Sequence, residues 1–164
     1  MSVAGIDIGN STSCIALARK GGVDLLLNKE SNRETPSVVT FNAKQRQAGT
    51  DAVGAMATNP RNTVFQLKRL LGKQFSDPDV QRDLAEFPFK VAAASDGGCE
   101  VEVSYRGEPT RFAPEQLVAA LLADLRAQAE REQGGPVTEA VLAVPLYWGE
   151  AERAAMLAAG QAAG

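Results

Sequence analysis

The sequence predicts an α/β fold in which helices cover a mixed β-sheet that carries an inserted α+β segment. Three observations support this fold class. The chain opens with three short apolar runs joined by tight turns, which is typical of an antiparallel meander. Near its end, the segment at 137–144 is nearly all apolar in its second half and lies between two helical patterns, which is typical of a buried strand beside helices. Between these regions, residues 36–112 show short strands and helices of their own, and we expect them to fold as a small subdomain.

The opening meander is predicted to consist of strands at 3–8, 12–19 and 23–28. Gly21-Gly22 is a two-residue hairpin signal between the second and third of these strands. A polar run at 29–34 then predicts a loop, and a short strand rich in β-branched residues follows at 37–41.

The next part of the chain is predicted to be helical. A first helix runs from a capping residue at Thr50 or Asp51 to Asn59, where a proline follows. A second helix is predicted over 62–71, because its apolar side chains recur at helical spacing and a glycine follows as a stop. Those apolar positions are Val64, Leu67, Leu70 and Leu71. A short third helix begins at Asp77-Pro78, with proline in the favoured first turn.

The remaining elements are a small antiparallel sheet and an α-β-α sequence. The sheet is predicted from strands at 88–94, 100–105 and 109–112, with turns at Asp96-Gly97-Gly98 and Arg106-Gly107. The longest helix spans about 113–132, since leucines form an apolar stripe along it. A strand at 137–144 follows and is expected to be buried on both faces. An alanine-rich helix at 149–163 ends the sequence.

Composition and charge exclude several classes of function. With 17 basic and 20 acidic residues the net charge is -3, and no basic run occurs, which argues against nucleic acid or an anionic membrane as a partner. The chain contains no histidine, which excludes Ser-His and Cys-His catalysis and the usual zinc sites.

The cysteines and the N-terminus point to the cytoplasm. Cys14 and Cys99 are far apart in the sequence; a disulfide between them is conceivable, but two reduced, buried thiols are the preferred interpretation. Asp7 interrupts what would be the apolar core of a secretion signal, and no run approaches the ~20 apolar residues that span a bilayer. We therefore expect a cytoplasmic protein.

The first candidate site is the turn formed by Gly9, Asn10, Ser11 and Thr12 after the first strand, with Asp7 beside it. Backbone N–H groups and hydroxyls in such a turn suit phosphate oxygens, and a nearby carboxylate suits a divalent cation. A plain hairpin turn explains the same pattern, since glycine and asparagine are common turn residues. Against that simpler interpretation, a charge within an apolar strand needs a partner when it is buried. The segment is not a Walker A loop, because no G-x-x-x-x-G-K pattern is present.

Two other segments are weaker candidates on their residues alone. Lys68 lies on the predicted helix at 62–71, where a solvated lysine is the simpler interpretation. Pro145, Tyr147 and Trp148 close the strand at 137–144, where ligands commonly bind, although aromatic packing at a helix start is preferred. Arg153 belongs to a charged helix start.

Five motifs in order along the chain together resemble the 70-kilodalton heat shock protein family. They are Gly5 to Ser13, Asn32 to Val39, Asn59-Pro60 with Asn62-Thr63, Phe65 to Gly72, and Thr138 to Pro145. The resemblance implies an actin-like ATPase fold, which is ribonuclease H-like, and specifically lobe I of the nucleotide-binding domain over residues 1–164. It implies a core subdomain at about 1–35 and 113–164, with the inserted subdomain at about 36–112.

The resemblance also implies roles for the candidate residues. Gly9, Asn10, Ser11 and Thr12 would form the phosphate-binding turn for ATP or ADP, and Asp7 would lie at the Mg²⁺ and potassium site. Lys68 would contact the γ-phosphate and position the attacking water.

Two further positions match residues that relay the nucleotide state towards a peptide-binding domain. They are Pro145 and Arg153. The implied partners are nucleotide, other chaperones and cochaperones, lobe II and the peptide-binding domain.

Two departures from the family pattern qualify this assignment. Asn10-Ser11 stands where two threonines are usual, and this looks more like the larger 110-kilodalton branch, whose members act mainly as nucleotide-exchange factors and holdases. ATP binding is therefore expected more firmly than rapid hydrolysis. The chain also lacks lobe II and the peptide-binding domain, so we expect it to be a fragment with one side of an ATP site. The alternatives are a stand-alone chaperone-interaction module and, less well matched, a sugar or acetate kinase.

Overall fold

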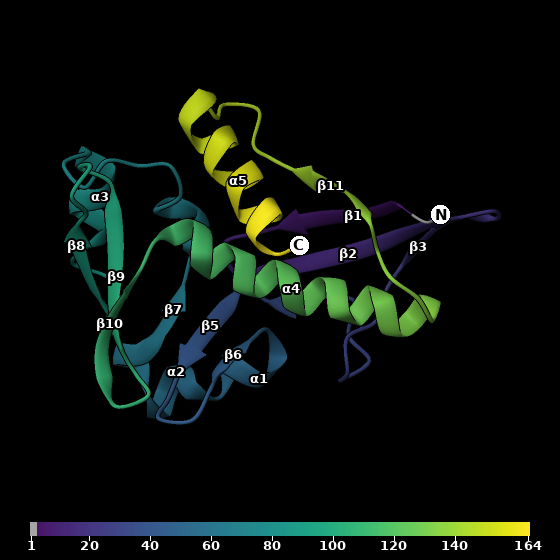
Figure 1. Cartoon of the computed structure of the whole chain (residues 1–164), viewed down its shortest axis with the longest axis horizontal. Helices are drawn as coiled ribbons and strands as arrows, with labels where there is room; N and C mark the ends of the chain where they lie inside the picture. The colour runs from purple at the N-terminus through teal and green to yellow at the C-terminus, as the bar shows by residue number, and fades with distance from the viewer. Residues whose placement is uncertain (1–2) are drawn as a thin grey trace.

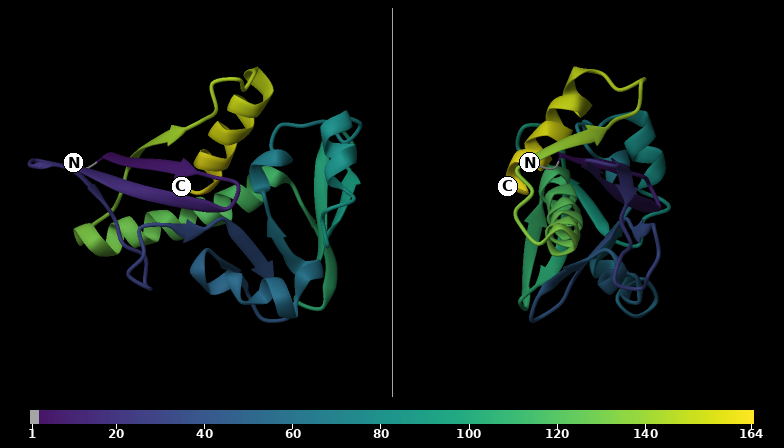
Figure 2. Two further views of the ribbon diagram at one scale, coloured as in Figure 1. Left: turned by 180° about the vertical axis from the view of Figure 1, so that it is seen from behind. Right: turned by 90° about the vertical axis from the view of Figure 1, so that its right-hand side faces the viewer.

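The main sheet of the molecule is mixed, as predicted. The computed structural model describes residues 3–164 (Figures 1 and 2). The strands of the sheet are β1 (Val3–Ile8), β2 (Thr12–Arg19), β3 (Gly22–Leu25), β4 (Thr35–Pro36) and β11 (Glu139–Ala143). Their order is β11-β1-β2-β3, with β4 also pairing with β2. β11 pairs with β1 in parallel, whereas the other pairs are antiparallel.

One face of this sheet is buried and the other is open. In β1, Ala4, Ile6 and Ile8 are buried, whereas Gly5 and Asp7 between them are exposed. The buried face packs under α4 (Pro114–Gln133) and α5 (Glu150–Ala162). Because side chains alternate along a strand, the open face carries every second residue of β1 and β2.

Two small sheets form the other half of the molecule. Their strands are β5 (Val38–Phe41), β6 (Arg46–Ala48), β7 (Thr63–Phe65), β8 (Lys90–Ala93), β9 (Cys99–Tyr105) and β10 (Glu108–Phe112), in the orders β6-β5-β7 and β10-β9-β8. The short helices around them are α1 (Thr50–Val53), α2 (Ala55–Thr58), η1 (Pro60–Asn62), η2 (Leu67–Arg69) and α3 (Pro78–Asp83). Aromatic rings join the two sheets: Phe41 of β5 stacks on Phe112 of β10 with 4.6 Å between ring centroids.

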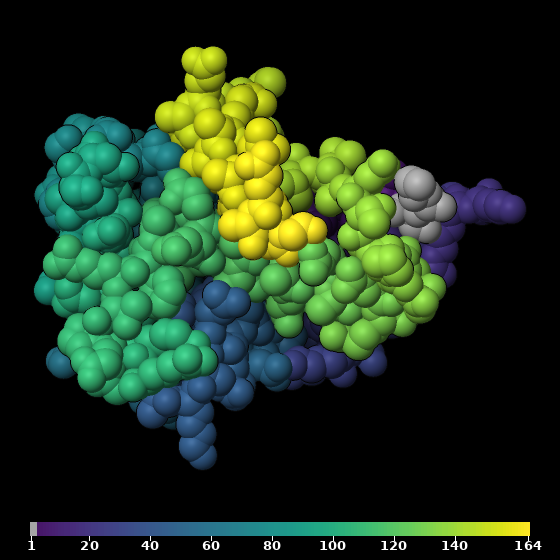
Figure 3. Space-filling model, viewed as in Figure 1, coloured from purple at the N-terminus to yellow at the C-terminus, as the bar shows by residue number. Residues whose placement is uncertain are grey.

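Helix α4 connects the two halves, and Figure 1 shows it running across the molecule from the small sheets to the far end of the main sheet. Its residues Leu117, Leu121 and Leu125 are fully buried. They belong to one hydrophobic core that includes residues of β1, β2, β5, β9 and α5. The space-filling view shows α5 and the segment of β11 standing above α4 (Figure 3).

The predicted helix at 62–71 is wrong. Thr63–Phe65 instead forms β7, which pairs with β5, and a short 3₁₀ turn at Leu67–Arg69 follows. Gln66, with a left-handed φ of 54°, separates the two. All four apolar positions of the predicted stripe are nevertheless buried. The apolar spacing therefore identified core residues correctly, but a strand followed by a tight turn buries them.

The predicted burial of the strand at 137–144 is also wrong. β11 spans only Glu139–Ala143, and its residues are exposed except for the half-buried Leu142. Within the described residues it lies at the edge of the main sheet with β1 as its one neighbour, so only one of its faces meets the core.

Other boundaries differ in smaller ways. β3 ends at Leu25 rather than at 28, and the first helix of the middle region is divided at Gly54 into α1 and α2. The strands β1 and β2, the sheet β8–β9–β10 and the helices α3, α4 and α5 are confirmed to within a few residues. The boundaries of the inserted subdomain at 36–112 stay a prediction.

The cysteine prediction is confirmed in part. Cys14 and Cys99 are both free, but only Cys99 is buried, and Cys14 is half-exposed on the open face of the sheet. Within residues 3–164, the structure contains no helix with the length and apolar character needed to cross a membrane.

Candidate functional site

The turn between β1 and β2 leaves backbone donors free. The Gly9 N–H donates to the Thr12 carbonyl at 2.9 Å and closes the turn around Asn10 and Ser11, which are both exposed. Within residues 3–164, the N–H groups of Asn10 and Ser11 have no protein acceptor. A Cβ atom at position 9 would lie 2.3 Å from the Thr12 carbonyl oxygen. Only glycine therefore fits this turn without moving it.

Neighbouring residues hold the turn in place. The Ser37 N–H donates to the Ser11 carbonyl at 2.8 Å. The Ser37 and Ser13 hydroxyls are hydrogen-bonded at 2.7 Å and are buried. Thr12 lies opposite Pro36 of β4. The turn is thus preorganised, which lowers the entropic cost of binding a ligand.

Asp7 lies two residues before the turn, on the open face of the sheet. Its side chain is exposed because only one face of β1 is covered, so the argument that a buried charge needs a partner does not apply to Asp7. Within the described residues no three acidic, cysteine or histidine side chains cluster to hold a metal. A lone exposed carboxylate still fits Mg²⁺, which commonly takes one or two protein carboxylates and completes its shell with water and phosphate oxygens.

Lys68 lies on η2 rather than on an α-helix, and it is half-buried. Its Nζ atom lies 5.7 Å from the centroid of the Trp148 ring, within the range of a cation–π interaction. Trp148 itself is buried, with 7% of its surface exposed. The simpler interpretation of Lys68 as a solvated helix residue is therefore wrong. Aromatic packing at the start of α5 is confirmed for Trp148 but not for Tyr147, which is 86% exposed.

The sheet register brings Lys68 to the end of the sheet that carries the turn. Ala143, the last residue of β11, lies opposite Asp7 in the parallel pair. The segment containing Trp148 therefore leaves the sheet at the same end as the 9–12 turn. Independently, Val38, next to Ser37, pairs with Phe65 at the end of β7. Ligands of α/β sheets bind at this carboxyl end of parallel strands.

Arg153 orders the loop between β11 and α5. Its Nε donates to the Trp148 carbonyl at 2.9 Å, and a terminal guanidinium nitrogen donates to the Leu146 carbonyl at 3.3 Å. The Trp148 N–H donates to the Pro145 carbonyl at 3.2 Å. The two predicted relay positions, Pro145 and Arg153, thus belong to one hydrogen-bonded loop, although their relay role stays a prediction.

One ion pair near this loop was not predicted from the sequence. Lys73 Nζ lies 2.6 Å from Glu152 Oε1. The hydrogen bond with Glu152 raises the pKa of Lys73, and the same contact lowers the pKa of Glu152. Glu152 lies in the charged first turn of α5. The one local signal is its position three residues after Gly149, whose N–H donates to Glu152 Oε2 at 3.1 Å.

The comparisons with known proteins decide the family. A family model described as "Hsp70 protein" matches residues 3–164. The chain belongs to the Hsp70 family. It is 44% identical over all 164 residues to heat shock 70 kDa protein 16 of Arabidopsis thaliana, of which it covers 22%. It is 43% identical to the 97 kDa heat shock protein of Mesocentrotus franciscanus, of which it covers 18%. It is also 41% identical over 160 residues, 98% of the chain, to heat shock 70 kDa protein 2 of Paracoccidioides lutzii, covering 24% of that protein.

The family assignment made from the five motifs is confirmed, and the relatives include the larger type of family member. The chain spans about a fifth of the length of the curated relatives that it matches.

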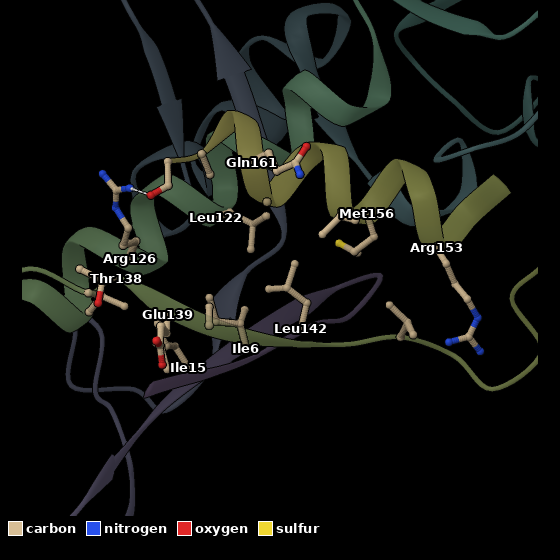
Figure 4. A pocket seen from close by; sticks show the side chains of 18 residues that line it. Ile6, Ile15, Leu122, Arg126, Thr138, Glu139, Leu142, Arg153, Met156 and Gln161 are labelled. Atoms are coloured by element: carbon tan, nitrogen blue, oxygen red, sulfur yellow. Dashed lines mark hydrogen bonds between the residues drawn. The ribbon is translucent and has the colours of Figure 1, made fainter. Parts of the chain in front are cut away.

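This Hsp70-family chain also contains an apolar cavity of about 470 Å³ between the main sheet, α4 and α5. Figure 4 shows Ile6, Leu122, Leu142 and Met156 around it, with an arginine towards each end. Because the cavity is lined by Ile6, it lies on the buried face of β1. Asp7 lies on the opposite face, so the cavity is distinct from the 9–12 turn.

Proposed function

We propose that this chain is lobe I of the nucleotide-binding domain of an Hsp70-type molecular chaperone, with an actin-like fold, and that it binds one side of ATP. One observation carries the proposal: β11 leaves the sheet beside Asp7 and the 9–12 turn, and the Trp148 ring in the segment that follows lies 5.7 Å from Lys68 Nζ. The family match supports it. The inserted subdomain would be residues 36–112.

Each candidate residue would have its own role in binding the nucleotide, according to its chemistry. The free N–H groups of Asn10 and Ser11 would donate to phosphate oxygens, and Gly9 would allow the close approach. Asp7 would hold Mg²⁺ or its waters, and the bound ion would supply positive charge to offset the charge on the phosphate. Lys68 would contact the γ-phosphate and orient water. Potassium near Asp7 belongs to the same proposal.

Slow hydrolysis is part of the proposal. Asn10 places an amide where a threonine hydroxyl is usual in the family, and an amide lacks a hydroxyl proton to offer the reaction. Electrostatic stabilisation of the transition state is commonly the largest catalytic contribution, and half of the groups that would supply it belong to lobe II. A role in nucleotide exchange or as a holdase for related chaperones fits this balance, and a cytoplasmic location stays a prediction.

A second candidate function is a chaperone-interaction module that does not turn over ATP. The observation that favours it lies in the β11–α5 loop, where Leu146 and Tyr147 are 94% and 86% exposed. Two adjacent large exposed side chains of this kind suit a protein contact.

Calorimetric titration of the chain with Mg²⁺-ATP distinguishes the two functions. We expect saturable heat with a sub-millimolar dissociation constant, and ATP turnover at background level. Adding a complementary lobe II should raise turnover. If ATP binds neither to the chain nor to its mixture with lobe II, the nucleotide-binding proposal is wrong and the interaction module is favoured.

A further inference from the structure

We propose that the ion pair between Lys73 and Glu152 is a clamp that positions Lys68 at the phosphate end of the sheet. Lys73 and Glu152 are therefore positioning residues, not catalytic ones. The functional meaning of the clamp rests on the proposed role of Lys68, whereas the clamp itself is a structural claim that is testable without nucleotide.

The pair joins two segments that are far apart in the sequence. Lys73 follows η2, which carries Lys68, and Glu152 lies in the first turn of α5. The Nζ–Oε1 distance is 2.6 Å, and the two side chains are only 31% and 14% exposed. Fully exposed pairs contribute little because water screens them. A pair that is mostly shielded on the carboxylate side holds its geometry better.

Close backbone packing makes the contact stiff. Gly72 has a φ of +69°, and a Cβ atom there would lie 2.7 Å from the Glu152 Cα atom. The chain next to Lys73 therefore rests directly on the start of α5. The ion pair acts across a packed contact rather than across a flexible gap.

Glu152 links this contact to the loop that contains Trp148. Its second oxygen accepts a hydrogen bond from the Gly149 N–H at 3.1 Å. Gly149 follows Trp148 directly, and the next residue of the helix, Arg153, donates to the Trp148 carbonyl. Glu152 thus holds Lys73 with one oxygen and the Trp148 loop with the other.

The two linked segments meet again at the functional side chain. The Lys68 Nζ atom lies 5.7 Å from the centroid of the Trp148 ring. Lys68 and Lys73 belong to one segment, and Trp148 and Glu152 belong to the other. If the Lys73–Glu152 contact opens, the segment that carries Lys68 loses the ion pair that ties it to the segment that carries Trp148.

Trp148 provides the measurement, because it is the only tryptophan in the chain. The Lys68→Met substitution removes the ammonium group from above the ring and should change the Trp148 emission intensity. We expect this change to fall to less than half in the Lys73→Met background, and likewise with Glu152→Gln. Lys90→Met is the matched control background, since it breaks a 2.8 Å lysine–glutamate pair between β8 and β9. There the full effect of Lys68→Met should persist.

A merely stabilising pair predicts a different result. In that case Lys68→Met changes the emission equally in all backgrounds, and the clamp is refuted. Lys73→Arg keeps the charge and the donor, so in this background Lys68→Met should change the Trp148 emission nearly as much as in wild type. Failure of this rescue also counts against the clamp. If Lys73→Met does not fold, Glu152→Gln gives the same comparison, because it keeps an oxygen for the Gly149 N–H. Nucleotide is absent throughout, so loss of ATP binding in calorimetry would refute the proposed function and leave this result unaffected.

Discussion

Replacing Gly9 with alanine tests the turn that organises the candidate site. The added Cβ atom would lie 2.3 Å from the Thr12 carbonyl oxygen, an approach that cannot be tolerated without movement of the backbone. That oxygen is also the acceptor of the Gly9 N–H at 2.9 Å. The substitution therefore forces the turn open at the hydrogen bond that closes it.

The expected cost follows from these two contacts. Overpacking in a fixed environment costs about 1–3 kcal/mol, and losing a hydrogen bond costs about 0.5–1.5 kcal/mol. We therefore expect Gly9→Ala to lower the free energy of unfolding by about 2 kcal/mol or more. For a chain of this size that corresponds to a fall in Tm of at least about 4 °C.

Gly5→Ala is the matched control in the same strand. A Cβ atom at Gly5 meets nothing within 4 Å, so this change should be neutral or stabilise slightly. Urea denaturation followed by circular dichroism measures both variants, and calorimetry measures their ATP binding, which should be lost only in Gly9→Ala. Equal stability of the two variants would refute the steric reasoning, and unchanged ATP affinity in Gly9→Ala would separate the turn from nucleotide binding.

Three further predictions concern other residues. Lys68→Ala, assayed with a complementary lobe II, should abolish ATP turnover and leave the thermal melt intact; turnover within about twofold of wild type would contradict its role. Burial raises the pKa of Asp124, so its ionisation opposes folding as the pH rises; in urea denaturation Asp124→Asn should be more stable than wild type at pH 7, with the difference shrinking towards pH 4. Glu152 has a lowered pKa and Lys73 has a raised one. Their ion pair is therefore lost only when the pH falls through the pKa of Glu152 or rises through the pKa of Lys73. Acrylamide quenching of Trp148 should therefore stay flat between the ordinary pKa values of the two groups, 4.5 and 10.5, and increase only beyond them.

The sequence predicted the 9–12 turn because a turn of this kind is local. Gly9, Asn10 and Ser11 are consecutive, and the turn chemistry is contained in a few residues. Lys68 is different, because its position depends on the pairing of β7 with β5 and on Trp148, which is eighty positions away. Only the family resemblance singled it out, since its neighbours in the sequence carry no trace of those contacts.

The fold predictions failed where one pattern fits two structures. Val64, Leu67, Leu70 and Leu71 have helical spacing, yet a strand followed by a left-handed residue and a 3₁₀ turn buries the same four side chains. Hydrophobic periodicity reports which residues are buried but not the backbone that buries them. The predicted burial of β11 on both faces failed for a related reason, because an apolar run does not reveal whether its strand is central or at an edge.

Helix α4 has a consequence for how the molecule unfolds. Its 20 residues correspond to a rod of about 30 Å, and its buried leucines share one core with the main sheet and with the small sheets. Neither half retains its core if α4 unfolds, so the two halves are coupled energetically despite their separate sheets. We therefore expect a single cooperative transition on heating, with the amide protons of Leu117 to Leu125 exchanging only when the whole chain opens.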